Sequence, residues 1–250
     1  MKKLSGKTTI ITGAGSGIGK SIAFAFAQEG ANLILASRNT NRLNNTCDEI
    51  KQSGGNAIVI PTDVSKESEV INLFKTSTQQ FDKIDILINN AGVMEGGPLE
   101  NLSLETWNNV IKVNLTGVFL CSREAFKVMK TQGNGRIINI GSISAQMPRI
   151  NSLPYTTSKH GLVGLTKCIA LEGRDYNISA SALHPGNVLT ESRIERDQRR
   201  ATSTNRTDFE PMMSTEEFAE IAVTVASLPP HITMLESIVL PINQKYVGRG

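Results

Sequence analysis

Strand-like and helix-like segments alternate along almost the whole chain, and this order restricts the folds that the sequence can adopt. Strands are expected at 8–13, 31–37, 56–64, 84–92, 135–142, 177–186 and 236–242. Helices are expected at 20–30, 67–81, 104–130, 155–172 and 214–228, with a polar helix that ends at Lys51. Strands joined by helices pair in parallel, and apolar runs such as DILIN indicate that both faces of the sheet are covered. The predicted fold class is α/β: a doubly wound parallel β-sheet of about seven strands with helices on both faces, in a single domain over 1–250.

Charge, hydropathy and cysteine content exclude several classes of protein. The chain has 26 basic and 23 acidic residues, too even a balance to indicate a nucleic-acid partner. No apolar run approaches the roughly 20 residues that span a bilayer, and a strand that starts by Thr8 leaves no room for the apolar core of a signal peptide. The three cysteines and three histidines show no metal-ligand spacing. We therefore expect a cytoplasmic protein with reduced thiols, no bound metal, and no membrane or nucleic-acid partner.

A glycine-rich turn, TGAGSGIG, connects the first expected strand with the first expected helix. Glycine admits positive φ and lets another group approach the backbone closely. At a strand-to-helix turn this brings the N–H groups of the helix start toward a phosphate. The GxxxGxG spacing of Gly13, Gly17 and Gly19 differs from the GxGxxG dinucleotide fingerprint, and a tight turn can require glycine for structural reasons alone. Its place after the opening strand favours a dinucleotide phosphate site.

The end of the second expected strand bears on which dinucleotide binds. An acidic residue there would accept hydrogen bonds from the adenosine ribose hydroxyls and would repel a 2′-phosphate. The chain has Ser37 and Arg38 instead, and a guanidinium can pair with a phosphate through two parallel donors. The alternative is an ordinary exposed arginine in a loop. The sequence therefore favours NADP(H) over NAD(H).

The stretch NSLPYTTSKH contains Tyr155 and Lys159, four residues apart at the start of an expected helix. Pro154 suits a first helical turn, where its missing N–H would be unpaired in any case. Residues at i and i+4 lie on the same face of a helix, so the two side chains can point the same way. Taken alone, the pair is better explained as a surface tyrosine beside a solvated lysine, because such pairs arise often by chance.

Together these motifs resemble those of the short-chain dehydrogenases/reductases, a family of single-domain, NAD(P)-binding Rossmann-fold oxidoreductases. The resemblance covers nearly the whole chain, and Ser142 precedes Tyr155 by thirteen residues. The matching motifs are, in order, TGAGSGIG (12–19), DV (63–64), NNAG (89–92), Asn114 in KVNLTG, Ser142 in IGSIS, YTTSK (155–159) and HPGNVLT (184–190). The resemblance implies hydride transfer between a nicotinamide and a ketone or secondary alcohol.

The resemblance also implies a catalytic set and a cofactor site. The catalytic residues would be Asn114, Ser142, Tyr155 and Lys159. The cofactor-binding residues would be Gly13, Ser16, Gly17, Ile18, Gly19, Ser37, Arg38, Asp63, Val64, Asn90, Ala91, Gly92, Tyr155, Lys159, Pro185, Gly186, Val188 and Thr190. In the family, Asp63 would contact the adenine, the 90–92 segment the cofactor ribose, and the residues from Pro185 onward the nicotinamide.

The chemistry of carbonyl reduction gives each catalytic residue a role. Tyr155 would act as general acid, although an unperturbed phenol has a pKa of ~10. An ammonium ~4 Å away, at an effective dielectric of ~20, favours the phenolate by up to ~4 kcal/mol, or roughly three pKa units. Lys159 would supply this charge and bind the nicotinamide ribose. Ser142 would donate to the substrate oxygen, and Asn114 would anchor a water that links Lys159 to solvent.

The sequence constrains the substrate less than the reaction. Residues 190–212 correspond to the mobile substrate lid of the family, and five arginines there could attract an acidic substrate or simply form a solvated face. They are Arg193, Arg196, Arg199, Arg200 and Arg206. The chain lacks the Asp-Gly-Gly segment that ends many members of the family, which weakens the transfer of any one member's activity.

Several alternatives stay open. Besides a general NADP(H)-dependent oxidoreductase for a small-molecule carbonyl or alcohol, the sequence allows a 3-oxoacyl-[acyl-carrier-protein] reductase-like enzyme or a non-catalytic NADP(H)-sensing protein on the same fold. The resemblance implies a homodimer or homotetramer packed through 104–130 and 155–172. Apolar residues of the C-terminal tail, such as Ile238 and Tyr246, would otherwise be exposed and could add to a subunit contact.

Overall fold

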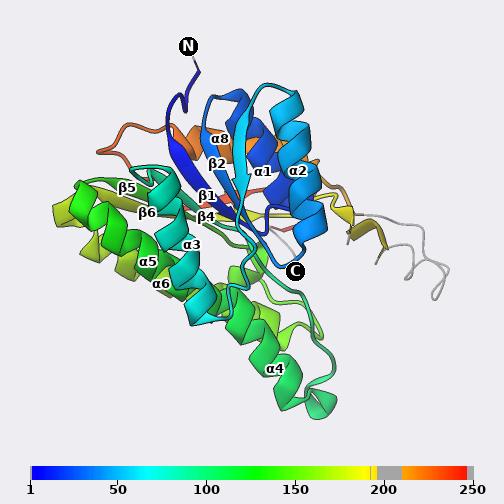
Figure 1. The fold of residues 1–250 in the computed structure, drawn as a ribbon. Coiled ribbons are helices and arrows are strands. Elements are labelled where there is room, and N and C mark those ends of the chain that lie inside the picture. Colours follow the sequence, from blue (N-terminus) through cyan, green and yellow to red (C-terminus); the bar gives the residue numbers. More distant parts are fainter. Residues whose placement is uncertain (1, 192, 196–209, 247–250) are drawn as a thin grey trace.

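The computed structural model describes residues 2–191, 193–195 and 210–246 (Figure 1). Seven strands form one parallel sheet in the order β3-β2-β1-β4-β5-β6-β7. The strands are β1 (Thr8–Thr12), β2 (Asn32–Ala36), β3 (Asn56–Val59), β4 (Ile86–Asn89), β5 (Gly135–Ile140), β6 (Ile178–Pro185) and β7 (Glu236–Val239). The predicted fold class, a doubly wound parallel sheet, is confirmed.

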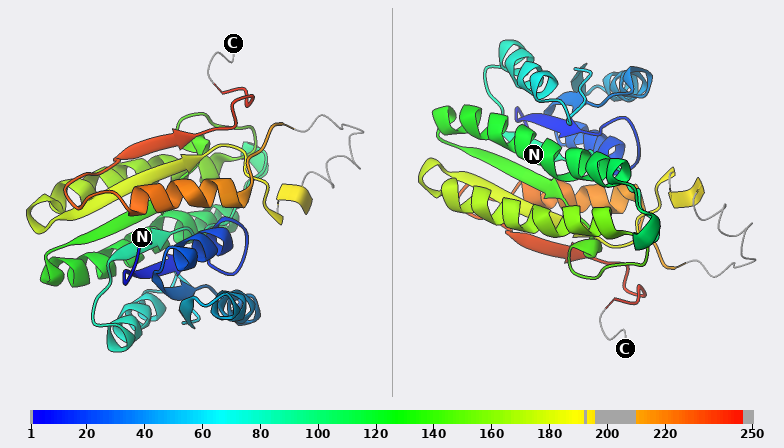
Figure 2. Two further views of the ribbon diagram at one scale, coloured as in Figure 1. Left: turned by 90° about the horizontal axis from the view of Figure 1, so that it is seen from above. Right: turned by 90° about the horizontal axis from the view of Figure 1, so that it is seen from below.

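Helices cover both faces of this sheet, as the two views of Figure 2 show. One face carries α1 (Gly17–Gln28), α2 (Thr40–Gln52) and α8 (Thr215–Ala226). The other carries α3 (Glu67–Gln80), α5 (Gly117–Gln132) and α6 (Leu153–Glu172), with α4 (Leu104–Ile111) leading into α5. Within the described ranges, no helix is both long enough and apolar enough to cross a membrane.

The core consists of two apolar clusters, one on each side of the sheet. Ile22 and Phe26 of α1 share the first cluster with Phe218 of α8, and all three are fully buried. Leu73 of α3 and Cys121 of α5 belong to the second. Complete burial of such a side chain contributes on the order of 1.5–3 kcal/mol. The two clusters therefore hold the strands, and with them the loops at the strand ends, in fixed positions.

Every strand ends earlier than the sequence pattern indicates, and the largest differences are in β3, β4 and β7. β3 stops at Val59 and β4 at Asn89, whereas apolar segments continue over 56–64 and 84–92. The chain stays buried after β3, where Ile60 is 6% exposed, so the apolar pattern runs on from strand into loop without marking the boundary. Asp63 and the 90–92 segment accordingly lie in loops beyond the sheet.

The helix expected at 104–130 is also interrupted. α4 ends at Ile111, a π-helical turn (η2) spans Lys112–Thr116, and α5 begins at Gly117. π-helical turns inside α-helices frequently occur at functional sites. Asn114, one of the predicted catalytic residues, lies within this turn, a feature that the sequence pattern did not reveal.

β1 and β4 are neighbours in the sheet, and their carboxyl ends lie side by side. These neighbours form the point at which the strand order reverses, because the chain extends from β1 to β2 and β3 on one side and returns to β4 on the other. Ligands of open α/β sheets bind in the crevice at such a switch point. Gly13 follows β1 and Asn90 follows β4, so the fold brings the predicted phosphate turn and ribose loop to this crevice.

Candidate active site

The turn between β1 and α1 leaves the start of the helix open to a ligand. Gly13 has a φ of 68°, in the left-handed region that favours glycine. A Cβ at Gly19 would collide with the carbonyl oxygen of Gly13 and with the side-chain amide of Asn90. Ser16 is the N-cap residue of α1 but makes no side-chain cap hydrogen bond, so it leaves the N–H groups of the first helical turn available to a ligand.

Asn90 fastens the end of β4 to this turn. Its side-chain amide donates to the carbonyl oxygens of Thr12 at 3.0 Å and Gly13 at 3.2 Å. The hydroxyl of Thr12 accepts from the backbone N–H groups of Asn90 at 3.0 Å and Ala91 at 3.1 Å. The predicted phosphate turn and the predicted ribose loop are therefore one hydrogen-bonded unit.

A cleft of about 200 Å³ beside this unit is lined by residues predicted for the adenosine half of the cofactor, Arg38 and Asp63 among them. Burial raises the pKa of the Asp63 carboxyl, but hydrogen bonds from Ser65 and the charges of Arg38 and Lys66 outweigh burial and hold the pKa below its ordinary value. Asp63 is therefore ionised at neutral pH, and its carboxylate can only accept hydrogen bonds.

Arg42 lines the same cleft and was not identified from the sequence. It lies in the first turn of α2, where its backbone N–H donates to the side-chain oxygen of the N-cap residue Asn39 at 3.0 Å. Its guanidinium lies 3.8 Å from the carboxylate of Glu191. The signal available in the sequence was a second arginine one helical turn after Arg38.

Tyr155 and Lys159 lie one turn apart near the start of α6, which has Pro154 in its first turn as predicted. The Nζ atom of Lys159 is 5.6 Å from the centroid of the Tyr155 ring, within cation–π range, and donates to the carbonyl oxygen of Ile140 at 2.9 Å. Burial lowers the pKa of Lys159 from 10.5 to about 8. The lysine is therefore held beside the tyrosine and is predominantly charged at pH 7.

Ser142 follows β5, and its backbone contacts a buried histidine. Its hydroxyl oxygen accepts from the backbone N–H of Ser144 at 3.1 Å, which leaves the hydroxyl hydrogen to donate. Its own backbone N–H donates to Nδ1 of the buried His184 at 3.1 Å. Burial lowers the pKa of His184 more than the nearby carboxylate of Glu236 raises it, so the ring is neutral at pH 7. Nδ1 also lies 3.1 Å from the carbonyl oxygen of Ser142, to which it donates in the tautomer that carries the hydrogen on Nδ1. His184 belongs to the HPGNVLT motif but was assigned no role from the sequence.

Asn114 joins the loop after β4 to the start of α6. Its side-chain oxygen accepts from the backbone N–H of Val93 at 2.8 Å, and its side-chain nitrogen donates to the Val93 carbonyl oxygen at 2.8 Å and to the Ser158 hydroxyl at 3.3 Å. The Ser158 hydroxyl donates to the carbonyl oxygen of Tyr155 at 2.6 Å. The Asn114 side chain thus fixes the loop after β4 against the first turns of α6.

Most of the predicted site residues line two clefts that share Gly92. Those in the smaller cleft are Gly13, Ser16, Ser37, Arg38, Asp63, Val64, Ala91 and Gly92. Those in the larger, of about 530 Å³, are Ile18, Asn90, Gly92, Ser142, Tyr155, Lys159, Pro185, Gly186, Val188 and Thr190. Gly19 and Asn114 are buried and line neither cleft. Two joined compartments fit the two halves of a dinucleotide.

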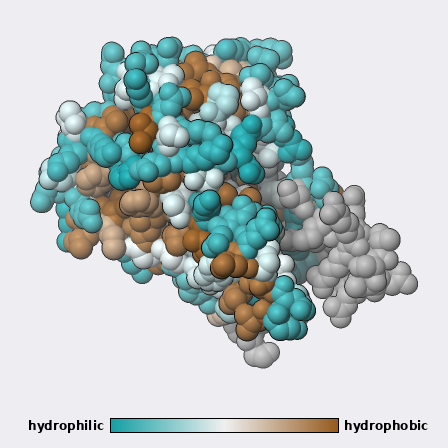
Figure 3. Space-filling model, turned by 60° about the horizontal axis from the view of Figure 1, so that its bottom comes forward, coloured by the Kyte–Doolittle hydropathy of each residue, from teal (hydrophilic) through white to brown (hydrophobic). Residues whose placement is uncertain are grey.

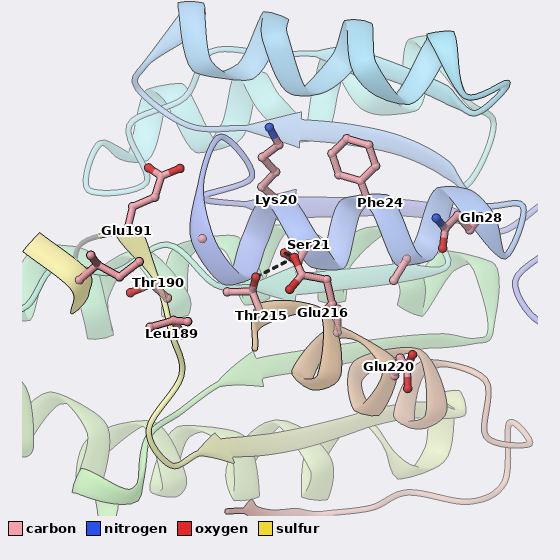
Figure 4. A pocket seen from close by; sticks show the side chains of 14 residues that line it. Lys20, Ser21, Phe24, Gln28, Leu189, Thr190, Glu191, Thr215, Glu216 and Glu220 are labelled. Carbon is pink, nitrogen blue, oxygen red and sulfur yellow. Dashed lines mark hydrogen bonds between the residues drawn. The ribbon is translucent and has the colours of Figure 1, made fainter. Parts of the chain in front are cut away.

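A separate pocket of about 570 Å³ lies between α1 and α8 (Figure 4). Ser21 of α1 and Glu216 of α8 meet in it, the serine hydroxyl donating to the carboxylate at 3.0 Å. Of the predicted site residues that the structure describes, Gly17 and Thr190 line it, and the predicted catalytic residues do not. This pocket is therefore not the candidate reaction site.

Besides Ser144, which follows the predicted Ser142 closely, the large cleft is lined by three polar residues with no assigned place in it from the sequence: Arg149, Asn187 and Arg193. Arg193 was counted among the arginines of the expected lid, Asn187 lies in the HPGNVLT motif but was assigned no role there, and no motif marks Arg149. Of that expected lid, 192 and 196–209 lie outside the described residues, and with them Arg196, Arg199, Arg200 and Arg206. Only the folded arrangement brings the three residues to the catalytic cleft.

Comparisons with known proteins agree with this geometry. The model of the short chain dehydrogenase family matches residues 7–201. Glucose 1-dehydrogenase 2 of Bacillus subtilis (strain 168) is 36% identical over 232 residues, which cover 90% of each chain. The 3-oxoacyl-[acyl-carrier-protein] reductase of Synechocystis sp. (strain ATCC 27184 / PCC 6803 / Kazusa) is 36% identical over 192 residues, covering 76% of this chain and 78% of the relative. A crystal structure of a variant actinorhodin polyketide ketoreductase with NADPH has a TM-score of 0.89 and 29% identity, covering 96% of this chain and 98% of the other.

The substitution Lys159→Met tests the burial of the lysine. The folded-state pKa is about 8 and the ordinary value 10.5, so between these values the unfolded chain binds more protons at this residue than the folded chain. The contribution of Lys159 to the free energy of unfolding should therefore rise with pH, by about 1 kcal/mol between pH 7 and pH 9. Urea unfolding of cofactor-free wild type and variant, followed by Trp107 fluorescence at both pH values, measures it.

The quantity to compare is the difference between the two proteins, because other groups titrate in both. Lys75→Met, at an exposed lysine of α3, is the matched control and should differ from wild type equally at the two pH values. The same constant difference for Lys159→Met would contradict a lowered lysine pKa.

Proposed function

The chain belongs to the short-chain dehydrogenase family and is an oxidoreductase acting on alcohols and carbonyls, and we propose that it depends on NADP(H) and uses Tyr155 as its general acid and base. The observation that carries the proposal is the placement of Ser142, Tyr155 and Lys159 on the wall of one cleft at the switch point of the sheet. The fold by itself would not carry it, because one fold hosts many activities.

The three residues divide the work of carbonyl reduction. When bound, the reduced nicotinamide supplies the hydride that the carbonyl carbon accepts. Ser142 donates its hydroxyl hydrogen to the carbonyl oxygen and so orients the substrate. Tyr155 gives its proton to that oxygen as negative charge develops, and the ammonium of Lys159 stabilises the phenolate left behind. Solvent then returns a proton to Tyr155, and alcohol oxidation runs the same steps in reverse.

The preference for NADP(H) is supported by charge in the smaller cleft. Two guanidinium groups, those of Arg38 and Arg42, line it together with Asp63. Arginine pairs with phosphate through parallel donors, so the two arginines would hold the 2′-phosphate. The N–H groups at the start of α1 would hold the pyrophosphate, and Asn90 and its neighbours would face the ribose.

We also propose a homodimer or homotetramer that packs through α4, α5 and α6. Apolar side chains are exposed on this side of the molecule (Figure 3), among them Leu104, Phe119, Leu153 and Leu171. The expectation that Tyr246 is exposed and available for a subunit contact is wrong. Tyr246 is buried against its own chain, where its hydroxyl donates to the side-chain oxygen of Gln146 at 2.8 Å.

Two of the remaining alternatives differ in support. A 3-oxoacyl-[acyl-carrier-protein] reductase-like activity is the second candidate, favoured by the relative of that name in Synechocystis sp.. A non-catalytic sensor is set aside, because the relatives that cover most of the chain are named as a dehydrogenase and a reductase. A cytoplasmic location is supported by the cysteines, all three of which lie in the described residues and are free thiols.

The substitution Tyr155→Phe removes the proposed acid and leaves the ring. The rate constant kcat for ketone reduction should fall by about 10²–10⁴-fold, the usual contribution of general acid catalysis, while the Kd for NADPH stays nearly unchanged. Absorbance of NADPH gives the first quantity for a panel of small ketones, and quenching of Trp107 fluorescence gives the second. The control is Tyr176→Phe, because the ring of Tyr176 packs edge-on against Phe126, away from the cleft. Retained turnover in Tyr155→Phe would rule out the assigned role.

The substitution Arg38→Asp tests the cofactor preference. Loss of a charge-assisted hydrogen bond costs about 1.5–3 kcal/mol, so the Kd for NADPH should rise roughly 10–100-fold while that for NADH falls or stays equal. Arg42→Gln should weaken NADPH in the same direction and leave NADH unchanged, and the exposed Arg174→Gln should alter neither. Titration of each protein with the two cofactors measures the ratio. An unchanged ratio in Arg38→Asp would show that Arg38 does not bind the 2′-phosphate.

A further inference from the structure

Two arginines from distant parts of the chain meet on the wall of the catalytic cleft. Arg149 precedes α6, and Arg193 follows β6 by eight residues. Both line the cleft that contains Ser142, Tyr155 and Lys159. A substrate bound in this cleft would therefore lie beside both guanidinium groups.

The arginines converge on one carboxylate and one amide. The Oε2 atom of Glu210 lies 3.5 Å from a terminal nitrogen of Arg149 and 3.9 Å from one of Arg193. The same oxygen accepts from the side-chain nitrogen of Asn187 at 2.9 Å. The side-chain oxygen of Asn187 accepts from Arg149 at 3.1 Å and from Arg193 at 3.4 Å. Three side chains from two segments of the chain thus surround a single carboxylate oxygen.

The chain holds these donors in place before any ligand arrives. Asn187 is 4% exposed, and its backbone N–H donates to the side-chain oxygen of the buried Gln244 at 2.7 Å. The Arg193 backbone N–H donates to the Thr190 hydroxyl at 3.2 Å. The hydroxyl of Ser152 donates to the Arg149 carbonyl oxygen at 2.6 Å. Such fixed donors lose little conformational entropy when they bind an anion.

The buried positive charge of the cluster has to be compensated by a negative charge. The side chain of Arg193 is only 11% exposed, and a guanidinium taken out of water is costly unless an anion and hydrogen bonds compensate it. Glu210, with 38% of its side chain exposed, supplies that anion from the edge of the cluster. A planar carboxylate is thereby seen in contact with this set of donors.

We propose that Arg149, Arg193 and Asn187 form a subsite for a carboxylate of the substrate, and that the carboxylate of Glu210 occupies this position when no substrate is bound. The substrate class is then an oxo acid, or the corresponding hydroxy acid, whose reacting carbon reaches Tyr155 while its carboxylate reaches the arginines. This inference rests on the proposed function of the cleft and adds the charge of the molecule that enters it.

Matched acids and esters measure the subsite directly. The probes are 3-oxobutanoate, 4-oxopentanoate and 5-oxohexanoate, each beside its methyl ester, which keeps the ketone and removes the charge. For at least one chain length, kcat/KM with NADPH should favour the acid by about tenfold or more. Arg149→Gln and Arg193→Gln should each abolish most of that preference through KM, with the ester unaffected. The exposed Arg174→Gln is the control. Equal acid-to-ester ratios in wild type and both arginine variants would overturn the proposal.

Glu210→Gln separates a substrate subsite from a merely structural cluster. If Glu210 competes with the substrate, its replacement should lower the KM for the acid several-fold and leave the ester unchanged. If the cluster only fastens the chain, the same change should weaken the acid and the ester alike, which would overturn the proposal. A stronger preference for a phosphorylated ketone such as dihydroxyacetone phosphate than for every acid would also overturn the assignment to a carboxylate.

A binding measurement keeps this proposal distinguishable from the proposed function. In the Tyr155→Phe background, the thermal shift of the protein with 4-oxopentanoate, relative to its methyl ester, reports the subsite without turnover. Loss of that shift in Arg149→Gln and Arg193→Gln supports the subsite even where no carbonyl is reduced. Normal reduction of the esters combined with no acid-dependent shift in any of these proteins would refute the subsite and leave the oxidoreductase intact.

Discussion

The close packing of α1 on the ends of β1 and β4 is the constraint on which both halves of the site depend. Gly19 has no room for a Cβ, because the carbonyl of Gly13 and the amide of Asn90 occupy that space. The same Asn90 amide bonds the ends of both strands. This contact therefore fixes the positions of the phosphate turn and of the loop that continues to Val93. The hydrogen bonds between Val93 and Asn114 extend this constraint to the start of the catalytic helix.

Lys159 shows how the fold sustains a chemically useful but unfavourable state. Burial lowers its pKa to about 8, which means that the protonated form is less stable inside the protein than in water. The carbonyl of Ile140 and the face of the Tyr155 ring offset part of that loss. Lys159 is only 6% exposed, so little water can solvate its ammonium. A charge kept in a low-dielectric site acts more strongly on the neighbouring phenol than a solvated one would.

The sequence predicted those parts of the site that local pattern determines. The glycine turn after β1, the i and i+4 spacing of Tyr155 and Lys159, and Pro154 in the first turn are local features, and the structure places them as expected. The strand ends were not predicted, because the hydrophobic pattern continues through buried loops. The π-helical turn around Asn114 was not predicted, because one inserted residue changes the helical periodicity too little to be detected. His184 and Arg42 were missed since their roles depend on neighbours that the fold supplies.

The cluster around Asn187 shows the same limit of sequence reasoning, because Arg149 and Arg193 are 44 positions apart in the chain and only the fold brings both to Asn187. A Cβ at Gly186 would collide with Gln244, so the glycine of the HPG motif is what allows the C-terminal tail to reach the backbone of Asn187. The atypical tail thus supports the residue that orients both cleft arginines. The residues proposed for the reaction are held by strand ends and one helix, whereas those proposed for substrate recognition come from a loop and a post-strand segment and are supported by the tail.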